Sequence, residues 1–188
     1  MGRIKAIARR TFLIGSAAVA GGVVFGVYKL KETPPNPLLS APENTSLIAF
    51  VIVNQDGVTL VAPKAEMGQG VQSTWAALIA EELDVEWDKV NVIHGPPAKA
   101  YYNSALLGLA LPFTDYEIGP FKNNVQEFVG EAAKLLNIQV TGGSTSMRDG
   151  FERMRIAGAA ARETLKLAAA KRLDIDVKKL RTENGFVL

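Results

Sequence analysis

The alternation of apolar and polar positions predicts a β-hairpin early in the chain. β-forming residues run from Leu47 to Val53 and again from Val58 to Val61, and Asp56-Gly57 stands between the two runs. An Asp-Gly pair flanked by apolar runs is a strong hairpin signal, because both residues tolerate the backbone angles of a tight turn. A further strand is expected at Val90–Ile93.

Three stretches carry apolar residues at helical spacing and predict amphipathic helices. We expect these helices at Val71–Leu83, Lys122–Leu136 and Met147–Leu173. Trp75 lies in the apolar stripe of the first helix and is expected in the core. The other inward-facing positions are Val71, Leu78, Ile79 and Leu83 in the first helix, Val125, Phe128, Val129, Ala132, Leu135 and Leu136 in the second, and Phe151, Met154, Gly158, Ala161, Leu165 and Ala168 in the third.

These elements predict an α+β (mixed α/β) fold of one domain. An N-terminal hairpin and a small mixed sheet would carry two to three amphipathic helices. Residues 98–120 contain prolines and glycine and are expected to form a long loop with a small amount of local structure. Near the end of the chain, Asn184-Gly185 predicts a turn between two short strands.

Two glycine turns precede two of the predicted helices and are the candidate binding elements. Gly68, Gln69 and Gly70 lead into the first helix, and Gly143, Ser144, Thr145 and Ser146 lead into the third. Glycine lets the backbone turn tightly, and the unpaired N–H groups at a helix start favour negative charge. Two such turns suggest a ligand with more than one phosphate, such as a dinucleotide-type cofactor. The alternative for the three hydroxyl residues is plain helix capping.

The first 31 residues have the pattern of a targeting segment. A basic start precedes an uncharged run over residues 11–28, and Lys29 and Lys31 follow. The stretch Arg9-Arg10-Thr11-Phe12-Leu13 resembles a twin-arginine export signal, with an ordinary signal anchor as the alternative. We therefore expect a signal or anchor at residues 1–31, a linker at 32–46 and the folded domain at 47–188. If uncleaved, residues 11–28 would cross the membrane and leave the domain in the periplasm.

The charge is unevenly distributed along the chain. Residues 1–31 hold six of the 21 Lys and Arg residues and none of the 19 Asp and Glu residues, so residues 32–188 carry 15 basic against 19 acidic side chains. A mildly acidic body argues against nucleic acid as a partner. The chain has no cysteine and so cannot hold an iron–sulfur cluster. The single histidine, His94, has no cysteine or acid beside it in the sequence and is more typical of a structural residue than of a catalytic one.

Three segments together resemble the molybdenum-cofactor-binding large subunit of the xanthine dehydrogenase and aldehyde oxidase family. Within that family the similarity is to the exported branch that includes isoquinoline 1-oxidoreductase β subunits. The segments are the arginine pair with Thr11-Phe12-Leu13, Lys64–Val71 with Ala80–Val85, and Thr141–Arg148 with Arg155–Arg162. Their order and spacing match over nearly the whole body.

The resemblance implies that Gly68, Gln69, Gly70, Gly143, Ser144, Thr145 and Ser146 hold the cofactor through backbone N–H groups and hydroxyls. It implies molybdopterin cytosine dinucleotide as the cofactor and oxidation of aldehydes or N-heteroaromatics with water-derived oxygen. It also implies that the chain is part of a larger molybdopterin-binding domain. It also implies a small partner subunit carrying the [2Fe–2S] clusters, and a cytochrome c as a further partner.

The sequence also departs from the family pattern. The family's catalytic glutamate lies in a Gly-x-Gly-Glu context that does not occur here, and Glu66 is better interpreted as structural than as a catalytic base. We therefore assign no catalytic or metal-ligating residue and expect the chain alone to be catalytically incomplete, as a fragment, a split subunit or a truncated gene product. The alternatives are an inactive remnant and a periplasmic binding module for a small phosphorylated ligand.

Overall fold

The computed structural model describes residues 22, 25, 27–39, 45–54, 57–112 and 119–188. The chain divides into two compact units, Met1–Thr33 and Pro34–Leu188. In the first unit, residues 27–31 are helical. No helix in the described part of the chain is long and apolar enough to cross a membrane. Most of the predicted signal or anchor at residues 1–31 lies outside the described residues.

A four-stranded mixed sheet forms one layer of the second unit. Its strands are β1 (Thr45–Ile48), β2 (Val51–Asn54), β3 (Gly57–Val61) and β4 (Val90–Ile93), in the order β1-β2-β3-β4. The first two pairs are antiparallel, and β3 pairs with β4 in parallel through the crossover helix between them. The predicted hairpin, the predicted strand at 90–93 and the mixed character of the sheet are confirmed.

The apolar run that predicted one strand at 47–53 is in fact divided into β1 and β2. The chain turns at Ala49-Phe50, so that Ile48 lies opposite Val51. Phe50 is buried and its ring lies 5.3 Å from that of Tyr101, whose hydroxyl donates to the Ala49 carbonyl at 2.6 Å. A distant tyrosine thus supports a turn that carries no glycine or proline signal of its own.

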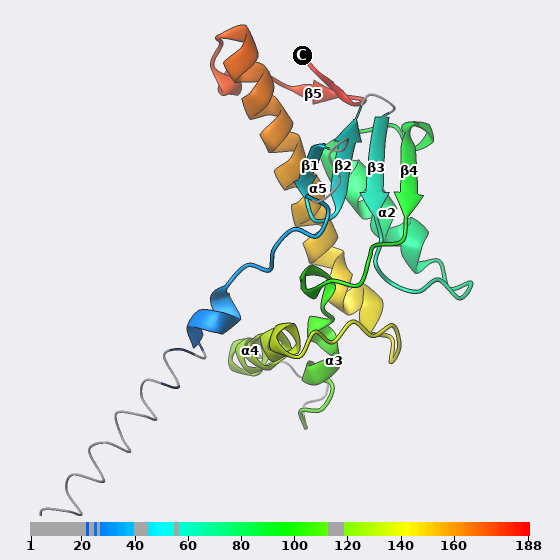
Figure 1. Cartoon of the computed structure of the whole chain (residues 1–188), viewed down its shortest axis with the longest axis vertical. Coiled ribbons are helices and arrows are strands. Elements are labelled where there is room, and N and C mark those ends of the chain that lie inside the picture. The colour runs from blue at the N-terminus through cyan, green and yellow to red at the C-terminus, as the bar shows by residue number, and fades with distance from the viewer. Residues whose placement is uncertain (1–21, 23–24, 26, 40–44, 55–56, 113–118) are drawn as a thin grey trace, which may run out of the picture. The chain divides into compact units, whose positions relative to one another are not determined.

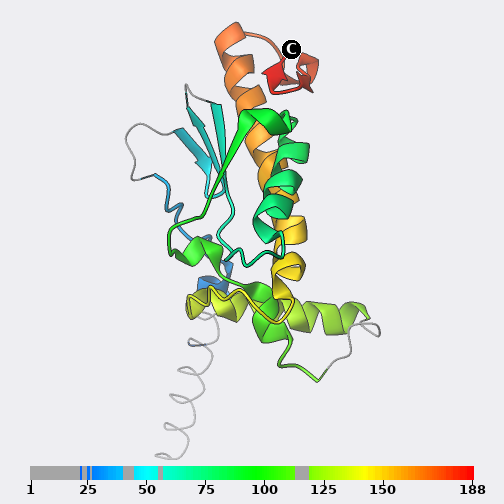
Figure 2. The same ribbon diagram turned by 90° about the vertical axis from the view of Figure 1, so that its right-hand side faces the viewer.

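Helices α2 (Val71–Leu83) and α5 (Thr145–Leu173) form the second layer, packed against each other and against one face of the sheet (Figure 1, Figure 2). The bounds of α2 are those predicted, and Trp75 is almost completely buried, as expected. The two helices approach closely at small residues: a Cβ at Gly150 would collide with the Trp75 ring, and one at Gly158 with the backbone of α2. Two positions predicted to face inward on α5, Phe151 and Ala168, are exposed instead.

A helical pair occupies the region near the start of α5 (Figure 1). Helix α3 (Ser104–Gly108) lies within the stretch predicted as a loop. It follows the 3-10 turn η2 (Lys99–Tyr101) and precedes the longer α4 (Pro120–Leu135), whereas the 3-10 turn η1 (Trp87–Lys89) lies before β4. Helix α4 packs on α3 and not on the sheet. Its contact face is formed by small residues such as Gly130 and Ala133, so the inward orientation predicted for Phe128, Leu135 and Leu136 is wrong, and these three side chains are exposed.

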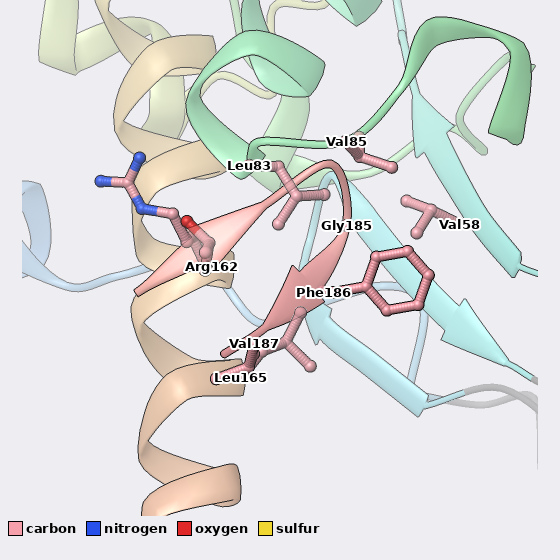
Figure 3. A pocket seen from close by; sticks show the side chains of 9 residues that line it. Val58, Leu83, Val85, Arg162, Leu165, Gly185, Phe186 and Val187 are labelled. Atoms are coloured by element: carbon pink, nitrogen blue, oxygen red, sulfur yellow. The ribbon is translucent and has the colours of Figure 1, made fainter. Parts of the chain in front are cut away.

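The chain ends in a short hairpin that follows the 3-10 turn η4 (Val177–Lys179). Strands β5 (Thr182–Glu183) and β6 (Phe186–Val187) pair antiparallel, and Asn184 and Gly185 both have positive φ, as the predicted Asn-Gly turn requires. The hairpin covers a small apolar pocket in which Phe186 lies toward Val58 (Figure 3).

Candidate functional site

The first glycine turn, residues 65–70, joins β3 to helix α2. Gly68 and Gly70 have φ of 93° and 78°, in the left-handed region that residues other than glycine rarely adopt. Gly70 is also the residue that precedes the first turn of α2. The shape of the turn therefore depends on glycine at both positions, which agrees with the reason they were singled out from the sequence.

The carboxylate of Glu66 fills this turn. Its Oε1 accepts hydrogen bonds from the N–H groups of Gly68 and Gly70, both at 2.8 Å, and its Oε2 accepts from the N–H of Gln72 at 3.0 Å. The N–H groups of Gln72 and Gly70 hold the pKa of the Glu66 carboxyl below its ordinary value. The N–H groups that the sequence predicted to be free are thus occupied by a carboxylate of the same turn, while the structural interpretation of Glu66 is consistent with this geometry.

Gln69 also bonds within the turn. Its Oε1 accepts from the N–H of Met67 at 2.6 Å, and its Nε2 donates to the carbonyl of Ala65 at 2.8 Å. The side chain therefore lies over its own backbone. A ligand that contacts Gln69 would have to exchange these two bonds for its own.

The second turn, residues 141–146, leads into α5 and has a different organisation. Ser144 is the exposed N-cap residue, has φ of 54°, and makes no capping bond through its side chain to any described residue. Thr145 is fully buried: its hydroxyl donates to the Gly142 carbonyl at 2.6 Å and accepts from Asn103 Nδ2 at 2.7 Å. Gly143 and Ser144 thus stay on the surface with Ser146 half-buried, whereas the Thr145 hydroxyl is used inside the protein.

The structure brings the two turns side by side. The N–H of Ala65 in the first turn donates to Thr141 Oγ1 in the second at 2.9 Å, across 76 positions of sequence. Beneath this contact, Lys64 Nζ lies 3.1 Å from Asp149 Oδ2, and both side chains are almost completely buried. The two atoms are close enough to form an ion pair. A buried ion pair therefore joins the base of one turn to the helix that follows the other.

Asp149 is the centre of a larger buried network. Its Oδ1 accepts from the backbone N–H of Ser104 at 2.9 Å and from its hydroxyl at 2.8 Å, and it lies 3.1 Å from Arg153. Arg153 in turn donates to the Tyr102 carbonyl at 2.8 Å. Burial lowers the pKa of Lys64, and the charge of Asp149 opposes that shift. Sequence reasoning missed this network, because nothing local distinguishes Lys64 or Asp149 from surface charges.

His94 lies at the end of β4 beside the first turn. Its Nδ1 is 3.2 Å from Nε2 of Gln72, which also donates to the carbonyl of Lys64 at 3.2 Å. Within the described ranges, no group of three or more His, Cys, Asp or Glu side chains could hold a metal ion. A surface hollow flanks the turn, lined by Glu66, Gly68, Gly70, Gln72, Ser73, Trp87 and Val92.

The comparisons with known proteins agree on one family. The family model described as a molybdopterin cofactor-binding domain matches residues 7–106, just over half of the chain and including the first turn. The isoquinoline 1-oxidoreductase subunit beta of Brevundimonas diminuta is 29% identical over 190 residues, which covers 97% of this chain and 20% of that protein. The chain thus spans about a fifth of the length of this relative. On these grounds it belongs to the family of molybdopterin cofactor-binding domains.

Proposed function

We propose that this chain is the cofactor-binding segment of a periplasmic molybdenum hydroxylase that oxidises aldehydes or N-heteroaromatics. The observation that carries the proposal is the pairing of the two glycine turns: they share a direct hydrogen bond and a buried ion pair, so one ligand can contact both. The name of the Brevundimonas relative supports an oxidation of the isoquinoline type. When bound, the cofactor, which we take to be molybdopterin cytosine dinucleotide, supplies the oxygen transfer and the electron acceptor.

The second turn fits the phosphate part of such a cofactor. Helix α5 is 29 residues long, and its N-terminus carries partial positive charge. Its first turn contains no acidic residue, and the Ser144 hydroxyl is not used for capping within the described structure. Gly143, Ser144 and Ser146 would hold the phosphates through N–H and hydroxyl donors, while Thr145 would support the turn from below through Asn103.

The first turn fits an uncharged, hydrogen-bonding part of the cofactor. Glu66 already supplies a negative charge there, so a second anion would be repelled. The amide of Gln69 can exchange its two bonds within the turn for a donor and an acceptor bond to a ligand, and Gly68 and Gly70 leave space for a flat group to approach. We therefore assign the pterin to Gly68, Gln69 and Gly70. This chain's own residues bind and orient the cofactor, and the proton transfers of the reaction are left to groups outside it.

The partners and location follow from the same proposal. The electrons would leave through a small subunit with [2Fe–2S] clusters, because this chain has no cysteine to hold them, and then reach a cytochrome c. The remaining part of the large subunit is a further partner in this proposal. The twin-arginine pattern at Arg9-Arg10 supports export to the periplasm, with residues 11–28 as a membrane anchor if they are retained.

A binding module for a small phosphorylated ligand is the second candidate. The exposed, uncapped second turn favours it, since that turn needs no metal to bind an anion. An inactive remnant is the third, and it predicts no ligand at either turn.

Cofactor content separates these candidates. The full chain would be affinity-purified under anaerobic conditions from the organism that encodes it, together with any bound polypeptides. Molybdenum would then be measured by mass spectrometry, and cytidine monophosphate after acid release. We expect about one of each per chain. An intact assembly with nucleotide or phosphate but no molybdenum would favour the binding module, and an assembly with neither would overturn the proposal.

A further inference from the structure

Glu66 occupies the position in the first turn where a bound anion would otherwise sit. Three backbone N–H groups converge on its two carboxylate oxygens at 2.8 to 3.0 Å. Two of these groups belong to glycines with positive φ, and the third lies in the first turn of α2. Converging N–H groups of this kind are the usual receptor for a phosphate or carboxylate, so the turn is an anion receptor that holds its own anion.

Burial does not explain this arrangement, because Glu66 is exposed to solvent. Capping explains part of it: Gly70 has no side chain to cap α2, and no acidic residue lies in the first turn of that helix. A glutamate four positions before the N-cap thus supplies both the missing cap and the charge that the helix dipole favours. A Ser at the N-cap would have capped the helix without placing a charge inside the glycine turn.

We propose that Glu66 is a specificity-determining residue: it excludes anions from the first turn, so that a ligand with phosphates can bind across the two turns in one orientation. The orientation that remains has the phosphates at the second turn and the uncharged part at the first. This inference rests on the proposed function for the nature of the ligand, but the exclusion itself is a property of this chain alone.

The neighbouring contacts make the exclusion effective. Gln69 bonds to Met67 and Ala65 on either side of Glu66, and Ala65 is tied to Thr141. Gln72, which donates its N–H to Glu66, is also held by its side chain to the Lys64 carbonyl. The carboxylate therefore sits in a turn that is fixed on both sides. An incoming phosphate would have to displace Glu66 and meet its charge at close range.

A pyrophosphate titration followed by NMR tests this directly. The full chain, labelled with 15N and held in detergent micelles, would be titrated with inorganic pyrophosphate at pH 7. The amide signals of Gly68, Gly70 and Gln72 report on the first turn. Four proteins would be compared: the wild type, Glu66→Ala, Glu66→Gln, and Glu81→Ala as a control that removes an exposed charge from the same helix α2.

The expected result is a gain of binding on loss of the carboxylate. In Glu66→Ala, the pyrophosphate affinity reported by the three amides rises at least tenfold over the wild type, and Glu81→Ala changes it less than twofold. Glu66→Gln, which keeps an acceptor but loses the charge, shows an intermediate gain. Equal pyrophosphate affinities at these amides in the wild type and Glu66→Ala would overturn the inference.

Hydrogen exchange gives a second readout that does not depend on any ligand. The same three amides should exchange at least tenfold faster in Glu66→Ala than in the wild type, while the melting temperature falls only by the small amount expected for loss of a helix cap. Unchanged exchange would show that the carboxylate does not hold the turn. Because both measurements concern the first turn alone, they can succeed even where molybdenum analysis shows that the proposed function is wrong.

Discussion

The two glycine turns both lead into a helix but differ in what occupies them. Each contains glycine with positive φ and leads directly into a helix. The first is filled by the carboxylate of Glu66, whereas the second keeps an exposed serine at its N-cap and is tied down through the buried Thr145. A glycine turn before a helix is therefore not in itself an anion site. What decides is whether a nearby side chain of the protein has already taken its donors.

Each turn has an exposed surface, and both turns pack on one buried cluster, which we call the shared foundation. The surface of each turn is exposed and differs in charge, but both rest on the Lys64–Asp149 pair and its neighbours. Changes to the foundation should disturb both turns and cost much stability. Changes at the surface should alter one turn and leave the fold intact.

Removal of Asp149 should have the largest effect on stability. Asp149→Ala leaves Lys64 and Arg153 without their carboxylate in a buried site, which costs about 3–5 kcal/mol of unfolding free energy. Urea denaturation measures it. Glu163→Ala is the control, because that residue forms an exposed pair with Lys166, and it should leave the midpoint unchanged. A midpoint near wild type for Asp149→Ala would contradict the idea of a shared foundation.

Addition of one methyl group should come next in size. In Gly150→Ala the new Cβ would collide with the buried Trp75 ring, and overpacking of this kind costs about 1–3 kcal/mol. Gly142→Ala is a matched control in the second turn, where a Cβ meets no described atom within 4 Å. Thermal unfolding of both variants should show a clear loss for Gly150→Ala alone, and equal melting temperatures would count against the close contact of α2 and α5.

Within the second turn, the buried hydroxyl should matter more than the exposed one. Thr145→Val removes a donor and an acceptor and leaves the Gly142 carbonyl and Asn103 with fewer partners, a loss of about 1–3 kcal/mol. Ser144→Ala removes a hydroxyl that caps nothing in the described structure, so stability should stay close to wild type. A larger loss for Ser144→Ala than for Thr145→Val, in chemical denaturation, would reverse our assignment of the two residues.

The smallest effect concerns pH and the first turn. Hydrogen bonds from the backbone lower the pKa of Glu66 in the folded chain. The contribution of Glu66 to folding stability is therefore present above its unfolded pKa of 4.5 and is lost as the pH falls through its lower folded pKa. The Gly68 and Gly70 amide shifts should therefore titrate below pH 4.5 in the wild type. In Glu66→Gln this titration should disappear, and its persistence would mean that another group is responsible.

Local patterns in the sequence predicted much of the fold. Helix α2 and strand β4 have the predicted bounds, because each is a regular apolar pattern ended by charged or turn-forming residues. The turn at Ala49-Phe50 could not be predicted, since it depends on Tyr101, some 50 positions later. Helix α4 was placed with the wrong face inward, because its large apolar side chains, such as Phe128, outweighed the small Gly130 and Ala133 that allow close packing.

The sequence predicted where the two glycine turns lie but not how their side chains are bonded. The glycines mark where the turns lie, because their conformations are local requirements. Glu66 was visible next to the first turn, yet the sequence could not show that its carboxylate points back into the N–H groups. The Lys64–Asp149 pair and the Ala65–Thr141 bond join residues more than 70 positions apart, and single-sequence patterns carry no information on such contacts.

The most direct test of the account is the cofactor nucleotide retained when the second turn loses its two serine hydroxyls. Cytidine monophosphate released by acid would be measured per purified chain for the wild type, for Ser144→Ala/Ser146→Ala, and for Thr164→Ala, a hydroxyl control farther along α5. The account predicts about one nucleotide per chain for the wild type and the control, and at least a tenfold loss for the double variant. Full nucleotide content in the double variant, or none in the wild type, would contradict it.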